Sequence, residues 1–551
     1  MGAPFPELAF VPLGGTGEIG MNLNVYMAGE SLLAVDCGIG FGGTERPEAE
    51  IMLPDPAWLV QRRAGLTGLV ITHAHEDHVG AVAYLWPRLR CPVYATPFAA
   101  AVLRRKLAEA GLVNDVPLTL IPPGGAFGCG PFSLQFINVA HSTPEAQALA
   151  IRTPAGLIIH TGDWKLDPSP TLGPPTDEAA LAELGRQGVL ALVCDSTNAM
   201  VEGHSGSESD VRDEIASIIA QTRGRIVVTC FASNVARVES IARAARNARR
   251  SVVIAGRSLR NLEVAARDCG YLRGIPQFLP EESAEDIADD NLLLLVTGSQ
   301  GEARSALSRI ADDRHRNIAL GEGDTVIFSS RVIPGNERAV AAVKDALVRR
   351  GVRLISDDEA HVHVSGHPAR EELRTLYRLV RPRYAVPVHG EGRHLAAHAA
   401  LAREEGAKPI LLDDGDILRL APGEPEVVDA APVGRLVLDG TRLVPFDGAV
   451  MGARRRMLQG GLVIASLAVD ARGRLRGMPV VSAPGVFDPE SGETQRLAEA
   501  LADELSELGP MGGDEDSLAD AARAALRRGL ARGEGRGAGR RPQVEVHLVR
   551  L

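Results

Sequence analysis

The sequence lacks the features that would place it in a disulfide-bonded, secreted or membrane class. Its six cysteines are scattered and form no Cys-x-x-Cys pair, which argues against a cysteine zinc site and favours reduced, buried thiols. No apolar run reaches the roughly eighteen residues that a membrane span needs. The N-terminus lacks a basic region followed by an apolar stretch, so a signal peptide is not expected. We therefore expect a cytoplasmic protein without a membrane partner.

Positive charge and aromatic rings are also scarce. The net charge is −11, and aromatic residues make up only 4% of the chain. Both values argue mildly against a nucleic-acid partner, because phosphate contacts need Lys and Arg and base stacking needs aromatic rings. Arginines are nevertheless concentrated in three stretches, residues 243–250, 454–456 and 523–541. Each stretch is more typical of a solvated face or a tail than of an RNA contact.

The chain's 551 residues exceed what one hydrophobic core supports, so three or four domains are expected. Short strands with intermittent helices up to about Asp195 predict stacked sheets flanked by helices. Regular strand–helix alternation over Ser209–Asp357 predicts a parallel sheet. Pro422–Pro432 is typical of a linker. The tail from about Arg456 predicts three strands and two helices, with a mobile Gly- and Arg-rich loop at Gly529–Arg541.

The densest functional signal is the stretch Thr72–Gly80. It follows a predicted buried strand, Gly68–Thr72, and precedes a predicted helix, Val79–Leu89. A turn that leaves a strand can hold several side chains toward one point. We therefore predict a metal site rather than a polar loop with chance histidines. Its ligand side chains are His73, His75, Asp77 and His78.

Three further side chains at the ends of predicted strands, His141, Asp163 and His389, complete a two-metal arrangement. One ion would be held by His73, His75 and His141, and the second by Asp77, His78 and His389. Asp163 can bridge the two. Imidazole and carboxylate ligands without thiolate suit Zn²⁺, with Mn²⁺ as the alternative. Two ions about 4 Å apart would activate water for in-line attack on phosphorus. Asp36 is predicted to support a ligand imidazole from behind, and His160 to be structural.

A glycine-rich motif near the N-terminus suggests a different function, dinucleotide binding. Gly15–Gly20 matches the Gly-x-Gly-x-x-Gly pattern of dinucleotide-binding loops. That fingerprint requires a following helix in a βαβ unit. Met21–Asp36 predicts two strands instead, so nicotinamide or flavin binding is not expected. These glycines are predicted to shape a loop near the active site.

The ligand motifs, in this order, resemble those of the metallo-β-lactamase superfamily. Three later residues resemble motifs A, B and C of the β-CASP nucleases: Asp195 of Val193–Asn198, His367 of His-Val-Ser-Gly-His, and His389 of Pro-Val-His-Gly-Glu. The segment of about 150 residues between Asp195 and His361 resembles the β-CASP domain in size and position. With its C-terminal appendage, the chain most resembles the bacterial ribonuclease J family.

The resemblance implies an α/β fold: an αββα metallo-β-lactamase sandwich with an inserted parallel βα β-CASP domain and a small α/β C-terminal domain. The expected boundaries are 1–205 and 358–430 for the sandwich, 206–357 for the insert, 431–455 for a linker and 456–551 for the C-terminal domain. It further implies a zinc ribonuclease with 5′→3′ exonuclease and endonuclease activity in RNA maturation and decay. Two Zn²⁺ per subunit, a homodimer or homotetramer, and RNA-decay partners belong to this expectation.

The resemblance assigns catalysis to Asp77, Asp195 and His367; whether Asp195 orients His367 or assists proton transfer stays open. Loops that precede predicted helices are candidate phosphate sites, because helix N-termini offer free N–H groups. One such loop leads into Pro368, a favourable first helical residue. The predicted substrate-binding residues are His363, Val364, Ser365, Gly366 and His367, with Ser233 and Asn234 cradling a terminal 5′-monophosphate. Simple helix capping is the alternative.

Three other functions are alternatives to an RNA nuclease. A hydrolase of a small lactone or thioester would share the first ligand motifs but would not need the long insertion. A β-CASP nuclease directed at DNA would share the whole arrangement. A metal-free RNA-binding scaffold on an inactive hydrolase fold is disfavoured, because the ligand set is intact.

Overall fold

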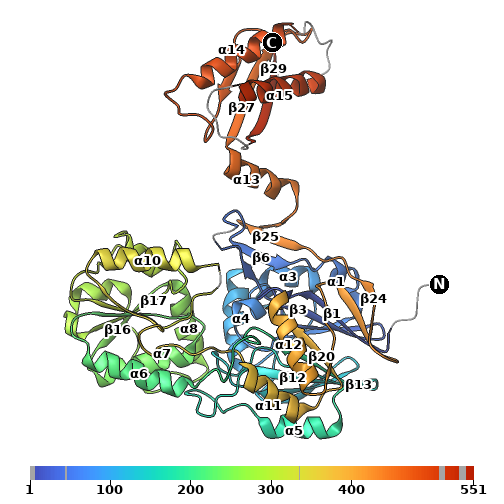
Figure 1. Cartoon of the computed structure of the whole chain (residues 1–551), viewed down its shortest axis with the longest axis vertical. Coiled ribbons are helices and arrows are strands. Elements are labelled where there is room, and N and C mark those ends of the chain that lie inside the picture. Colours follow the sequence, from blue (N-terminus) through green and yellow to red (C-terminus); the bar gives the residue numbers. More distant parts are fainter. Residues whose placement is uncertain (1–5, 44–45, 334, 508–514, 533–540) are drawn as a thin grey trace. The chain divides into compact units, whose positions relative to one another are not determined.

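The structure, a computed structural model, describes residues 6–43, 46–333, 335–507, 515–532 and 541–551. It divides into two compact units, Met1–Leu438 and Asp439–Leu551, which we describe separately (Figure 1). No helix in the described ranges is both long and apolar enough to cross a membrane. All six cysteines are free thiols, as their spacing predicts.

The first unit is built on two sheets packed face to face. The larger sheet has the order β24-β23-β1-β3-β4-β7-β8-β9. Its strands are β1 (Leu8–Gly14), β3 (Leu23–Ala28), β4 (Ser31–Val35), β7 (Leu66–Val70), β8 (Val93–Ala95), β9 (Leu118–Leu120), β23 (Asp416–Ala421) and β24 (Glu426–Ala430). Leu33 and Val70 from this sheet pack with Phe136 and Ile158 of the second sheet in one buried core.

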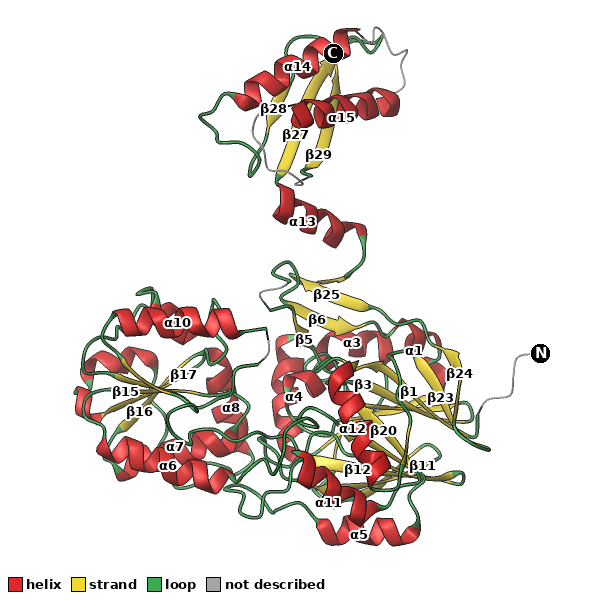
Figure 2. Cartoon of the chain, in the orientation of Figure 1, coloured by secondary structure: helices red, strands yellow, loops and turns green. Residues whose placement is uncertain are grey.

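The second sheet has the order β10-β11-β12-β13-β14-β20-β22. Its strands are β10 (Ala126–Cys129), β11 (Phe132–Asn138), β12 (Gln147–Thr153), β13 (Gly156–His160), β14 (Ala191–Asp195), β20 (Tyr384–Val388) and β22 (Lys408–Pro409). Its outer face is covered by α5 (Glu178–Gln187), α11 (Arg370–Val380) and α12 (Gly392–Glu404) (Figure 2). Helix α4 (Pro97–Glu109) contacts β8 and β9 of the first sheet. The predicted αββα sandwich is confirmed.

The insert between β14 and β20 forms a separate five-stranded parallel sheet, β16-β17-β15-β18-β19, as its alternating pattern predicts. The strands are β15 (Ile226–Thr229), β16 (Ser251–Ala255), β17 (Leu292–Val296), β18 (Thr325–Phe328) and β19 (Arg353–Ile355). The helices are α6 (Glu208–Gln221), α7 (Val235–Asn247), α8 (Arg257–Asp268), α9 (Ala306–Ala311) and α10 (Glu337–Arg349). The flanking strands β14 and β20 pair directly in parallel, so the insert leaves the sandwich sheet uninterrupted.

Both connections of the insert meet at the fully buried side chain of Arg237. On the entering segment, Glu208 accepts two hydrogen bonds from the guanidinium, at 2.5 and 2.9 Å. On the returning segment, the carbonyl of Val362 accepts a third at 2.9 Å. A buried guanidinium needs this full set of partners, because an unpaired charge in the core is costly. One side chain therefore fixes both ends of the insert.

The segment 422–455 is ordered rather than a plain linker. Pro422–Pro432 contains β24, which extends the larger sheet by pairing with β23. Residues 431–455 contain β25 (Arg435–Asp439) and β26 (Arg442–Pro445) and enter α13 (Ala449–Gly460). Because β25 pairs with β6 (Ile51–Pro54), the first unit extends to Leu438.

After α13, the described residues of the second unit form the predicted three strands and two helices. Its sheet has the order β28-β27-β29, with β27 (Leu462–Val469), β28 (Val480–Ser482) and β29 (Gln543–Arg550). Alternate residues of β27 are buried, and α14 (Glu493–Glu507) and α15 (Glu515–Arg532) pack on that apolar face. Of the predicted loop Gly529–Arg541, residues 529–532 belong to α15, and residues 533–540 lie outside the described ranges.

Candidate metal centre

The predicted ligands stand where strands of the sandwich end. His73 and His75 follow β7, Asp77 and His78 lie in the short helix α2 (Glu76–Val79), His141 follows β11, Asp163 follows β13 and His389 follows β20. The strands β13, β14 and β20 run parallel, so their carboxyl ends share one edge of the sheet. The predicted helix Val79–Leu89 is divided, because α2 ends at Val79 and α3 spans Val82–Leu89.

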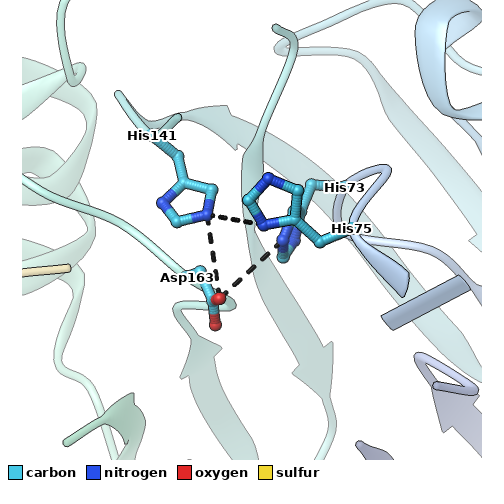
Figure 3. A group of neighbouring side chains, drawn as sticks. All are labelled: His73, His75, His141 and Asp163. Atoms are coloured by element: carbon cyan, nitrogen blue, oxygen red, sulfur yellow. Dashed lines mark hydrogen bonds and ion pairs between the residues drawn. The ribbon is translucent and has the colours of Figure 1, made fainter. Parts of the chain in front are cut away.

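One group of side chains, which we call the histidine side, consists of His73, His75 and His141. Together with Asp163, their ligand atoms all lie within 4.8 Å of one another. His141 Nε2 is 3.1 Å from His75 Nδ1, and Asp163 Oδ2 is 3.8 Å from Nε2 of both His73 and His141 (Figure 3). Burial lowers the pKa of His75 to about 4 and those of the other two rings well below their usual value, so all three are neutral.

The second group, the carboxylate side, consists of Asp77, His78 and His389. With Asp163 they also keep their ligand atoms within 4.8 Å of one another. His389 Nε2 lies 3.1 Å from Asp77 Oδ2, and His78 Nε2 lies 3.2 Å from Asp163 Oδ1. Burial alone would lower the pKa of His389, but the carboxylates of Asp163, Asp195 and Asp77 raise it to about 10. The pKa of His78 is likewise raised against burial, chiefly by Asp163.

The unsatisfied atoms of this cluster fit bound metal. His73 Nε2 and Asp163 Oδ1 are buried without a hydrogen-bond partner among the described residues. Such orphaned atoms are rare in native proteins and call for a ligand. Nitrogen and oxygen donors in this mixture suit zinc-type ions. The side chains on both sides therefore fit metal ions, with Asp163 common to both.

Asp36 supports one ring on each side from behind. It accepts from His78 Nδ1 at 2.8 Å and from the Thr72 hydroxyl at 2.8 Å, and Thr72 Oγ1 lies 3.1 Å from His73 Nδ1. Because the carboxylate only accepts, each Nδ1 carries a proton, and each Nε2 faces the centre, where it can bind metal once it is unprotonated. The sequence pointed to Asp36 but missed Thr72, which stands directly before the first histidine.

Asp195 and His367 form a hydrogen-bonded pair at the same edge. His367 Nδ1 donates to Asp195 Oδ2 at 2.8 Å and lies 3.8 Å from Asp163 Oδ2. Burial opposes protonation of His367, but Asp195 and then Asp163 raise its pKa. The Thr197 hydroxyl lies 2.9 Å from His389 Nδ1, a partner that sequence reasoning missed although it belongs to the motif A stretch.

The segment Ser365–His367 lies against the centre as predicted. His141 Nδ1 donates to the carbonyl of Gly366 at 2.7 Å, which leaves its Nε2 free for a ligand. A Cβ on Gly366 would lie 2.7 Å from the His141 ring, so only glycine permits this approach. Asn198 holds the segment through bonds to Ser365 Oγ and the His367 carbonyl, at 2.8 and 3.1 Å.

Contrary to the prediction, this segment does not form the N-terminus of a helix. Helix α11 begins at Arg370, because the Glu372 carboxylate accepts from the N–H of Ala369 at 2.7 Å and fixes the helix start there. The N–H groups of Arg370 and Glu371 donate to the carbonyls of Val201 and Gly203. The amides of Ala369, Arg370 and Glu371 are therefore not free to bind a phosphate.

The other predicted phosphate-binding residues are Ser233, Asn234, His363 and Val364, and their surroundings differ. Asn234 caps α7 by accepting from the Arg237 N–H at 2.8 Å, which is the alternative role that the sequence left open; Ser233 is half-buried beside it. Burial and then the charges of Arg237, Arg331 and Lys165 lower the pKa of His363 to about 3, so the ring is neutral within a basic environment. Val364 is buried.

Two predictions about neighbouring residues are confirmed. After Gly15–Gly20 come the strands β3 and β4 rather than a helix. The short strand β2 (Thr16–Gly17) pairs with β21 (Gly390–Glu391), and the Gly15 carbonyl accepts from the His389 N–H at 2.7 Å, so this loop borders the centre. His160 is structural, with its Nδ1 2.8 Å from the Tyr26 hydroxyl.

Comparisons with known proteins identify the family. The chain is 47% identical to ribonuclease J of Sinorhizobium meliloti, over 88% of this chain and 87% of that protein. It is 41% identical to ribonuclease J of Mycobacterium tuberculosis (84% and 83%) and 38% identical to that of Corynebacterium glutamicum (92% and 72%). The chain belongs to the ribonuclease J family.

Family models match three parts of this ribonuclease J family member. They are a beta-lactamase superfamily domain over 33–228, the ribonuclease J beta-CASP domain over 223–347, and a Zn-dependent metallo-hydrolase RNA specificity domain over 359–412. A crystal structure of an Enterococcus faecalis protein of unknown function matches with a TM-score of 0.51 and 18% identity, over 74% of this chain and 99% of that one. That likeness supports the fold alone.

Proposed function

We propose that the protein is a metal-dependent ribonuclease that hydrolyses phosphodiesters. The observation that carries this proposal is the meeting of the histidine side, the carboxylate side and the Asp195–His367 pair around Asp163. The family membership and the match to an RNA specificity domain support RNA as the substrate. A hydrolase of lactones or thioesters has no comparable support.

The proposed ligands are His73, His75 and His141 for one Zn²⁺, and Asp77, His78 and His389 for the other, with Asp163 shared. Mn²⁺ suits the same donors. When bound, two such ions would lower the pKa of a water and neutralise charge on the phosphate. Among the protein's own contributions, Asp36 keeps the Nε2 atoms of His78, directly, and of His73, through Thr72, facing inward.

His367 is proposed to stabilise the charge that develops on the phosphate. Its raised pKa favours the protonated ring, and the bond from Nδ1 to Asp195 directs Nε2–H away from that carboxylate. This geometry favours an orienting role for Asp195 over proton transfer. The expected products carry a 5′-phosphate and a 3′-hydroxyl.

We further propose 5′→3′ exonuclease activity with a preference for single-stranded 5′-monophosphorylated RNA, together with endonuclease activity. Residues 363–367, with Ser233 and Asn234, are proposed to hold the substrate phosphates beside the basic Arg331. A fixed spacing between that pocket and the metals would set the cut one nucleotide from the end. Action in rRNA and mRNA maturation and decay in the cytoplasm, as a homodimer or homotetramer with RNA-decay partners, belongs to the same proposal.

The product pattern on 3′-labelled RNA tests this function. With a 5′-monophosphate we expect metal-dependent release of single nucleotides, abolished by chelator and restored by Zn²⁺ or Mn²⁺. A 5′-triphosphate should slow the exonuclease but not internal cleavage. A matched DNA of the same sequence separates an RNA nuclease from one directed at DNA. Equal rates on both 5′ ends would refute the monophosphate pocket, and chelator-resistant cleavage would refute the metal mechanism.

A further inference from the structure

The insert touches the sandwich at a second place besides Arg237, along α4 and α8. The Arg105 side chain on α4 donates to Asn261 Oδ1 on α8 at 3.0 Å. The ring of Phe98, in the first turn of α4, meets the ring of Tyr271 edge-on with centroids 5.8 Å apart. This seam therefore joins a sandwich helix to a part of the insert that lies far in sequence from either connection.

One carboxylate, that of Glu145, binds both partners of the seam. Its Oε2 accepts from the backbone N–H of Phe98 at 2.8 Å, and its Oε1 accepts from the Tyr271 hydroxyl at 2.9 Å. The first bond is favourable because the N-terminus of α4 has free N–H groups and a partial positive charge. Burial and then the Glu145 charge raise the pKa of Tyr271, so its hydroxyl keeps the donated proton.

Glu145 belongs to the loop that starts at His141 of the histidine side. Its φ of 58° lies in the left-handed region, which is uncommon for a residue with a side chain. The loop is short and tied at its far end: the Ala146 carbonyl accepts from the Val139 N–H, and the Gln147 N–H donates to the Thr72 carbonyl, both at 3.1 Å. The intervening Thr143 and Pro144 are buried. A displacement of Glu145 therefore moves the loop that carries His141.

We infer that Glu145 is a positioning residue through which the inserted domain, by way of Tyr271, sets the placement of His141. This role rests on the proposed ribonuclease function. RNA that contacts both domains shifts the insert against the sandwich, and the Tyr271–Glu145 bond transmits that shift to the histidine side. The metal ligands are then all in place only when the insert is packed against the sandwich along α4 and α8.

Two conservative variants test the coupling, with a third as matched control. Tyr271→Phe removes one hydroxyl but keeps the ring against Phe98, and Glu145→Gln keeps the size but removes the charge. Asn261→Ala removes another cross-domain hydrogen bond of the same seam without touching the His141 loop. We expect Tyr271→Phe and Glu145→Gln each to lower kcat on RNA about tenfold, as loss of a charge-assisted hydrogen bond predicts, with little change in KM. Asn261→Ala should leave kcat within about twofold of wild type.

Metal affinity distinguishes the proposed coupling from a general weakening of the α4–α8 contact, which would leave metal affinity unchanged. In a chelator competition we expect both coupling variants, but not Asn261→Ala, to bind Zn²⁺ about tenfold more weakly at one of the sites. The double variant should lose no more than either single variant, because the two residues act as one unit. Wild-type metal affinity in Tyr271→Phe, or equal losses in all three variants, overturns the inference. If Glu145→Gln fails to fold, Tyr271→Phe against Asn261→Ala decides alone. Absence of RNA cleavage by the wild-type protein would instead refute the proposed function.

Discussion

The two sides of the metal centre share Asp163 yet carry their protons differently. The rings of His73, His75 and His141 are neutral, because burial keeps their pKa values low. On the carboxylate side, His78 and His389 have raised pKa values, because carboxylates surround them. The histidine side is thus already in the state that binds metal, whereas the carboxylate side must release protons first. Burial on one side and neighbouring carboxylates on the other therefore give the two halves of the centre different protonation states.

Removal of Asp163, the ligand that both sides share, should disrupt both sides and have the largest effect on RNA hydrolysis. Asp163→Asn is expected to lower RNA hydrolysis by about 10³-fold or more, since several kcal/mol of metal-based stabilisation are lost. Metal analysis should show loss on both sides, with the circular dichroism spectrum unchanged. Asp213→Asn, at an exposed surface carboxylate, is the control for charge removal. Retention of a full metal complement in Asp163→Asn would contradict the shared role.

Removal of one ligand from each side should separate the halves. His75→Ala and Asp77→Ala are each expected to lower turnover about 10²-fold or more, while one ion stays bound on the untouched side. Metal content measured at several pH values distinguishes them. Binding that remains in Asp77→Ala should depend little on pH above about 6, and binding that remains in His75→Ala should strengthen as pH rises. Identical pH profiles for the two variants would show that the halves do not differ.

Substitution of Asp36 or Thr72, which hold the rings of His73 and His78, should have a smaller effect on metal binding. Asp36→Asn should weaken metal binding about 10- to 100-fold on both sides, because Asp36 reaches His78 directly and His73 through Thr72. Thr72→Val removes only the branch to His73 and should weaken only the histidine side. Isothermal titration with Zn²⁺ resolves the two sites. A Thr72→Val loss on the carboxylate side would argue against this separate support.

The smallest effect is expected in the stability of the metal-free protein. The folded pKa of His389 is about 10 against 6.5 for the free side chain, so its stabilisation is complete below pH 6.5 and is lost as pH rises toward 10. The folded pKa of His75 is about 4, so its contribution is complete above pH 6.5 and is lost as pH falls toward 4. Urea unfolding of wild type, His389→Gln and His75→Gln should give differences with opposite pH slopes of about 1 kcal/mol per unit. Slopes of the same sign would contradict the comparison.

The sandwich, the parallel insert and the convergence of the seven proposed ligands were predictable from sequence, because strand ends and ligand spacing are local signals. The start of α11 was not, since it depends on the Glu372 carboxylate and on carbonyls of residues 201 and 203. Pro368 fits a first helical turn locally, but the cap from Glu372 and the tertiary hydrogen bonds to residues 201 and 203 set the boundary two residues later. The strand β24 was missed for a similar reason: its five exposed residues show no apolar alternation, and pairing with β23 alone makes it a strand.

Polar residues that support the centre through one or two long-range hydrogen bonds could not be predicted from the sequence either. Thr72, Thr197 and Asn198 hold ligand rings or the Gly366 loop, yet nothing in their spacing marks them as different from other polar residues. Glu145 is a further case, since its two partners come from residues 98 and 271. Long-range contacts of this kind need the folded chain.

The Arg237 guanidinium, which binds both ends of the insert, also shows how one domain can be inserted into another. Glu208 and Val362 reach the same side chain, and the strands on either side of the insert pair with each other. A module whose two ends meet can be spliced into or out of its host at one point without rethreading the host sheet. The arrangement at Arg237 therefore makes the insert a unit that can be exchanged without breaking the host sheet, so that a hydrolase core can change what it recognises.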